Sequence, residues 1–220
     1  MAGRTTPSCV STPALLAALE DCGDELGQVL GVLRAAGEPE PEALSLGTGD
    51  RILLGVLGAV TGENLEVAGQ CPHCETLNSA VVSPATVPPS AARVARLGRG
   101  GGLREPTYGD LVELPDGDAA ELLRRCVVGT PEVAPSAAAL ELVDDALTGP
   151  LVLACTGCGE QVAIDLDVQT AVLARLACHA HVVDSEIHLL ASAYHWSLSE
   201  IERLPDTRRA TLARLVAGGA

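Results

Sequence analysis

The chain has 220 residues, of which 47% are hydrophobic, only 1% are aromatic and none is phenylalanine, and its formal net charge at pH 7 is −15. This length suits one domain or two small ones with a core of aliphatic side chains. The negative charge disfavours nucleic acid and anionic lipid as partners, because both are themselves negatively charged.

The sequence lacks two apolar patterns, those of a membrane span and of a signal peptide, and this bears on the expected compartment. No stretch approaches the roughly 20 apolar residues of a membrane span, and residues 1–11 lack the apolar core of a signal peptide. We therefore expect a cytoplasmic protein without a membrane partner. In a reducing cytosol, CxxC pairs are metal ligands or redox centres rather than disulfide partners.

Residues 1–62 are expected to form the helical N-terminal part of an α+β protein. Apolar residues recur at helical spacing within residues 14–19, 26–33 and 52–60. Gly62 is expected to end the last of these helices.

Residues 63–168 carry two CxxC knuckles. Residues 71–74 read CPHC and residues 155–158 read CTGC, and β-prone runs flank each knuckle. Two hairpin tips that face each other would bring Cys71, Cys74, Cys155 and Cys158 around one ion, as in a zinc ribbon. Four thiolates suit one structural, redox-inert Zn²⁺.

The long insertion between the knuckles spans residues 83–150. Residues 119–128 and 137–147 predict helices, so we expect a helical insertion. Residues 83–102 are rich in Pro, Ala, Ser and Gly and predict a mobile connection. Because the entropy of loop closure grows only logarithmically with length, the site tolerates this insertion.

The cysteines and histidines allow other readings. A thioredoxin-like redox pair is disfavoured, since neither CxxC lies between a strand and a long helix. His73 is expected to point away from the four thiolates. We read Cys178, His179 and His181 as ordinary interior or surface residues, and we expect the isolated Cys9, Cys22 and Cys126 to be buried small hydrophobic residues.

Neither nucleic-acid binding nor catalysis is expected. Both ribbon arms, residues 62–82 and 151–168, lack basic residues and an aromatic platform for bases. No GxSxG, HExxH or GxxxxGK[ST] motif occurs, and a four-cysteine site leaves no position for a reactive water. We predict no catalytic residue and read the ribbon as a structural clamp.

Residues 169–220 predict three short amphipathic helices. Acidic and basic residues are nearly balanced between 184 and 216, so there is no basic stripe for DNA. Docking to a protein fits better, and we predict a partner surface made by Tyr194, Trp196, Ile201, Arg208 and Arg209.

The C-terminal pattern resembles a known family. Residues 186–191 read EIHLLA and residues 194–197 read YHWS, and the pairs EI, LP and RR follow at 200, 204 and 208. This pattern is similar to the signature of T4-type phage baseplate hub assembly chaperones, in the version found in extracellular contractile injection systems. The run at 46–50, both CxxC pairs and residues 104–107 and 125–127 share the family's order of elements. Two features depart from it: the second knuckle reads CTGC instead of a Pro-containing sequence, and Thr211 stands where an aromatic is common.

The resemblance implies a non-enzymatic factor that assembles the baseplate hub of a contractile tail-like particle and is absent from the finished particle. Its partners would be hub or spike-complex proteins. Three alternatives stay open: a permanent structural part of the baseplate, a zinc ribbon associated with transcription, and a thiol oxidoreductase.

Overall fold

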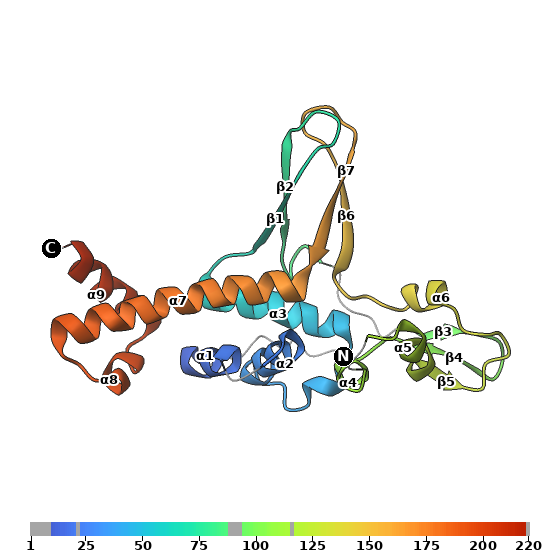
Figure 1. Ribbon diagram of the computed structural model, residues 1–220, viewed down its shortest axis with the longest axis horizontal. Coiled ribbons are helices and arrows are strands. Elements are labelled where there is room, and N and C mark those ends of the chain that lie inside the picture. The colour runs from blue at the N-terminus through green and yellow to red at the C-terminus, as the bar shows by residue number, and fades with distance from the viewer. Residues whose placement is uncertain (1–9, 21–22, 88–93, 115–116, 219–220) are drawn as a thin grey trace. The chain divides into compact units, whose positions relative to one another are not determined.

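A computed structural model describes residues 10–20, 23–87, 94–114 and 117–218 (Figure 1). The chain mixes helices and antiparallel strands, which confirms the α+β class. It divides into two compact units, residues 1–173 and 174–220, and the boundary falls inside helix α7 (Val168–Tyr194). None of the described helices combines the length and the apolar character that crossing a membrane requires.

The N-terminal part is helical, as predicted. Asp24 caps α2 by accepting the Gly27 amide at 2.7 Å, and Ser45 caps α3 by accepting the Thr48 amide. Gly62 ends α3 in the left-handed conformation, with φ of 74°, which costs glycine little. The elements are α1 (Thr12–Glu20), α2 (Glu25–Ala35), the 3-10 helix η1 (Pro41–Ala43) and α3 (Leu46–Thr61).

Two antiparallel hairpins follow from the β-prone runs. Strands β1 (Leu65–Gln70) and β2 (Leu77–Val82) form one, and β6 (Thr148–Ala154) and β7 (Gln161–Asp167) form the other. Figure 1 shows them side by side with their tips together. At Gly69, a Cβ would lie 2.8 Å from Ile164 Cγ1, so glycine permits this close approach.

The insertion contains a sheet that the sequence prediction did not include. Strands β3 (Val94–Arg96), β4 (Gly101–Arg104) and β5 (Val127–Gly129) pair in the order β3-β4-β5. The predicted connection at 83–102 therefore supplies one strand and the start of another, and residues 88–93 lie outside the described part. The helical prediction for 83–150 is incomplete, because the short helices α4 (Tyr108–Val112), α5 (Ala119–Arg125) and α6 (Ala137–Glu141) accompany this sheet.

A buried carboxylate fixes the base of the second hairpin. Asp50 accepts hydrogen bonds from the Leu147 amide at 2.7 Å, from Gln169 Nε2 at 2.9 Å and from the Tyr108 hydroxyl at 3.4 Å. Burial raises the pKa of Asp50 above its ordinary value, although these three hydrogen bonds act in the opposite direction. At Gly49, a Cβ would lie 2.3 Å from the Tyr108 ring. Asp50 thus joins α3, α4 and both ends of the hairpin.

Within its described residues, 174–218, the second unit has three helices, as predicted, although the first of them, α7, is 27 residues long rather than short. It is followed by α8 (Leu198–Glu202) and α9 (Asp206–Gly218). Ser197 and Glu200 form the expected capping box at the start of α8. The core of the unit is made by Leu190, Ile201, Leu212 and Ala213.

Candidate metal centre

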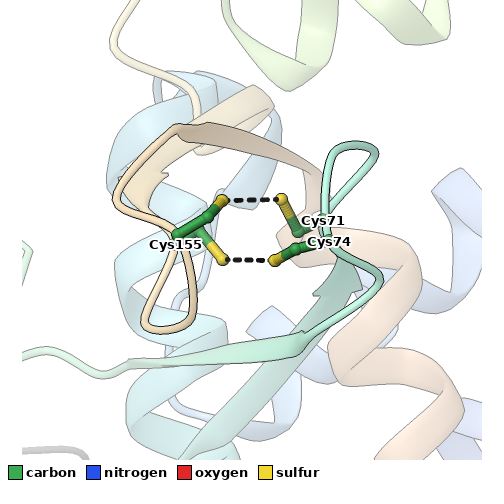
Figure 2. A group of neighbouring side chains, drawn as sticks. Cys71, Cys74 and Cys155 are labelled. Atoms are coloured by element: carbon green, nitrogen blue, oxygen red, sulfur yellow. Dashed lines mark hydrogen bonds between the residues drawn. The ribbon is translucent and has the colours of Figure 1, made fainter.

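The four predicted cysteines meet at the hairpin tips. Cys71 and Cys74 come from the β1–β2 turn, Cys155 and Cys158 come from the β6–β7 turn, and their sulfurs all lie within 4.8 Å of one another (Figure 2). Across the hairpins, Sγ–Sγ distances are 3.7 Å for Cys71–Cys158 and 3.5 Å for Cys74–Cys155. A disulfide would measure about 2.05 Å, whereas a tetrahedron with metal–sulfur bonds of about 2.3 Å has edges of about 3.8 Å. The group could therefore hold a metal ion.

Backbone hydrogen bonds shape the first turn. The Cys71 amide donates to the Thr76 carbonyl at 2.9 Å, and the Glu75 amide donates to the Cys71 carbonyl at 2.9 Å. Glu75 adopts a left-handed conformation with φ of 59°. The His73 amide donates to Cys71 Sγ at 3.4 Å. The turn thus directs the His73 amide at the sulfur of Cys71, the first cysteine of the knuckle.

The second turn repeats this arrangement. The Cys155 amide donates to the Glu160 carbonyl, the Gly159 amide donates to the Cys155 carbonyl, and the Gly157 amide donates to Cys155 Sγ at 3.3 Å. Gly159 has φ of 80° and occupies the place of Glu75. Because main-chain groups make this turn, CPHC and CTGC give the same geometry.

The four sulfurs perturb one another's ionisation. Backbone amides, that of Cys158 foremost, lower the pKa of the Cys155 thiol to about 6 against the opposing effect of burial. The backbone amide of Glu160 lowers the pKa of Cys158. Hydrogen-bond contact with the other three cysteines and burial both act in the opposite direction, and together they raise this pKa to about 12. Without a cation the cluster resists full deprotonation, and a bound metal removes that resistance because it offsets the charge of the thiolates.

Asn78 joins the two hairpins beside the cysteines. Its Oδ1 accepts the Thr156 amide at 2.9 Å and the Thr156 hydroxyl at 3.1 Å, while its Nδ2 donates to the Thr76 carbonyl at 2.8 Å and lies 3.6 Å from Cys155 Sγ. Sequence reasoning did not identify this residue. The available signal was an asparagine at an inward-facing position of a strand otherwise lined by apolar residues.

Packing explains why the second knuckle contains glycine. A Cβ at Gly157 would lie 2.4 Å from Thr76 Oγ1 and 3.3 Å from Cys74 Sγ. A larger residue would push the two tips apart, so Gly157 is matched to the opposing turn.

The other cysteines and histidines lie outside the cluster. In the described part of the chain, only the four knuckle cysteines form a group of three or more potential ligands, so His73, Cys178, His179 and His181 are not included. Cys126 is buried, as expected. Cys9 and Cys22 lie outside the described residues.

The predicted partner surface is only partly at the surface. Tyr194 and Trp196 are 41% and 36% exposed, and their rings stack with centroids 4.9 Å apart. Arg208 is also exposed. The prediction is corrected for Ile201 and Arg209. Ile201 is fully buried in the core of the unit, and Arg209 is buried and forms ion pairs with Glu186 and Asp206.

In comparisons with known proteins, no family model, no curated protein and no solved structure matches this chain.

Proposed function

We propose that this chain is a non-enzymatic assembly factor for the baseplate hub of a contractile, phage-tail-like injection system, and that one structural zinc ion closes its two hairpins as a zinc ribbon. The observation that carries the metal part of the proposal is the cluster of four sulfurs. The assembly role is supported by the resemblance of the C-terminal pattern and by an exposed aromatic pair.

Zinc suits the four cysteines better than other metals. Thiolates are soft ligands that select Zn²⁺, Cu⁺ or iron–sulfur clusters, and the sulfur spacing fits one ion at the centre of a tetrahedron. With Cys71, Cys74, Cys155 and Cys158 all bound, the ion has no open position for water or substrate. Such an ion stabilises structure and performs no hydrolysis.

The hairpins depend on this ion because their own core is small. Between them, Val162 and Ile164 are buried beside Cys71 and Cys155, with Val67 and Leu153 packed against this group. A two-stranded hairpin is only marginally stable by itself. Structural zinc contributes about 10–16 kcal/mol in small peptides, which is enough to hold the two tips together.

The aromatic pair of the second unit is suited to binding a protein. The chain has only two tyrosines and one tryptophan, and Tyr194 and Trp196 stack where α7 ends. Between them, His195 has φ of 57°, and its amide donates to the Ala191 carbonyl. Leu198, two residues after Trp196 in the sequence, is also 55% exposed. Aromatic residues in a fixed geometry are frequent hot spots of protein interfaces.

The baseplate assignment rests on the resemblance carried by residues 186–209. The hub or spike-complex proteins are the proposed partners, and the factor leaves once assembly is complete. Tyr194, Trp196 and Arg208 form the proposed contact surface.

Deleting the gene in the producing cell tests the role. Intact contractile particles should disappear, and they should return with the wild-type gene or with Val182→Ala, which alters an exposed apolar residue elsewhere on α7. A double Tyr194→Ala and Trp196→Ala variant should restore them poorly and should no longer co-purify with baseplate proteins. Normal particles from the deletion strain would refute the assembly role.

Mass spectrometry of purified particles separates the proposal from its nearest alternative. An assembly factor is absent, whereas stoichiometric presence would make the chain a permanent structural part of the baseplate.

A further inference from the structure

The three-stranded sheet of the insertion has one covered face and one open face. On the covered face, Leu103, Cys126 and Val143 form a core to which residues of α5 and α6 contribute. Figure 1 shows these two helices beside the sheet. On the other face, Val94 and Val128 are 61% and 46% exposed. A groove of about 490 Å³ lies over these residues.

Glycine in the central strand creates the groove. Arg96 pairs with Gly102, and Gly102 pairs with Val128, so one row across the sheet has a side chain at each end and none in the middle. Glycine is also required by the backbone, since a Cβ at Gly102 would lie 2.2 Å from the Ala95 carbonyl oxygen. The result is a trough with a main-chain floor and with Val94, Arg96 and Val128 at its sides.

The groove carries positive charge on a strongly acidic chain. Residues 94–104 contain three arginines and no acidic residue, against a net charge of −15 for the whole chain. Arg104 is occupied by Asp110, with N–O distances of 2.6 and 2.8 Å. Within the described part of the chain, Arg96 and Arg99 line the groove without an ion pair or side-chain hydrogen bond. Glu132 lies beside the loop at Gly98 and pairs with neither.

We propose that this groove binds an extended acidic segment of a partner protein. A guanidinium group donates two parallel hydrogen bonds to a carboxylate, and exposed valines offer contact to apolar side chains of the same segment. Nucleic acid is the less suitable anion, because the groove has no aromatic side chain on which a base would stack. The acidic chain also repels a long polyanion more than a short peptide with a few carboxylates.

A labelled peptide tests this directly with the full-length protein. The probe is a short fluorescein-labelled peptide with Ser at every second position and with Glu and Val taking turns at the positions between. In an extended strand, the Glu and Val side chains of this peptide lie on one face. Fluorescence anisotropy should show binding that weakens at least about tenfold in the double variant Arg96→Ala and Arg99→Ala. Replacing Glu by Gln in the peptide should have a similar effect.

The matched control is the double variant Arg175→Ala and Arg203→Ala, which removes the same charge from exposed positions outside the groove. It should bind the peptide as the wild type does. Absence of binding, equal weakening in both double variants, or equal affinity for the Gln peptide would overturn the proposal. Tighter binding of a single-stranded oligonucleotide that depends on Arg96 and Arg99 would overturn it in favour of nucleic acid.

Discussion

Removing the metal ligands should loosen the two hairpins without a large loss of packing. Cys74 and Cys158 are the exposed members of the cluster, one on each hairpin, so replacing both by Ser removes two thiolates and little buried surface. The remaining Cys71 and Cys155 cannot complete a tetrahedral site. We expect the double variant to bind no structural zinc.

The magnitude follows from the free energy of zinc binding, because the unfolded chain does not hold the four cysteines around an ion. Structural zinc contributes about 10–16 kcal/mol in small peptides, and closing the 81 residues between Cys74 and Cys155 costs about 4.5 kcal/mol of it, which leaves about 5.5–11.5 kcal/mol. A natural domain has a total stability of only about 5–15 kcal/mol. For a unit of this size, each kcal/mol corresponds to about 2–4 °C, so loss of the ion should lower the melting temperature by at least about 11 °C.

Metal analysis and thermal unfolding together test this reasoning. The wild-type protein should contain one zinc ion per chain, and a chelator should lower its melting temperature to that of the double variant. Cys178→Ser is the matched control, because Cys178 is exposed and outside the cluster, and it should keep both the zinc and the melting temperature. Purified wild-type protein without bound metal, or equal melting temperatures for the double variant and the control, would refute the reasoning.

Three further substitutions test packing and charge in the first unit. Gly49→Ala would place a Cβ 2.3 Å from the Tyr108 ring and should lower the free energy of unfolding in urea by about 1–3 kcal/mol. Gly58→Ala, in the same helix, is the control: its Cβ would make only an ordinary contact at 3.7 Å. This second substitution should raise the free energy of unfolding by about 0.5–1 kcal/mol. Equal effects would show that the contact with Tyr108 is unimportant. Burial raises the pKa of Asp110, but hydrogen bonds from Arg104 and from the start of α4 outweigh it and lower the pKa to about 2. Because this folded value lies below the unfolded value of about 3.9, the stabilisation is present above about pH 4 and is lost as the pH falls toward 2. Asp110→Asn should therefore reduce stability at neutral pH and flatten its decline in acid, and an unchanged acid limb in urea titrations would contradict the assigned ion pair.

The grouping of the four cysteines was predictable because its signal is local and repeated. Each CxxC follows one β-prone run and precedes another, so two hairpin tips could be inferred without knowing how residues 75–154 return. Asn78 gave no such signal, since its role depends on Thr156 in a hairpin remote in sequence. A residue that acts between distant segments is recognised only when the segments are placed together.

The sheet of the insertion was missed because of its glycines. Gly100, Gly101 and Gly102 are typical of a loop when read along the sequence, yet here they let strands approach so closely that a Cβ at any of them would lie within 2.4 Å of a carbonyl oxygen. The partner surface was over-predicted for a related reason. Ile201 and Arg209 share their segment with exposed residues, and only the packing of α8 and α9 shows that both are buried.

The second hairpin is held at its base and at its tip by interactions of different strength. At the base, Asp50 accepts hydrogen bonds from Leu147 just before β6 and from Gln169 just after β7. Hydrogen bonds of this kind contribute about 1 kcal/mol each, and they require no metal. At the tips, the proposed zinc ion supplies most of the attraction between the two turns. We therefore expect loss of the proposed ion to release the tips, while Asp50 keeps the second hairpin anchored on α3 in either case.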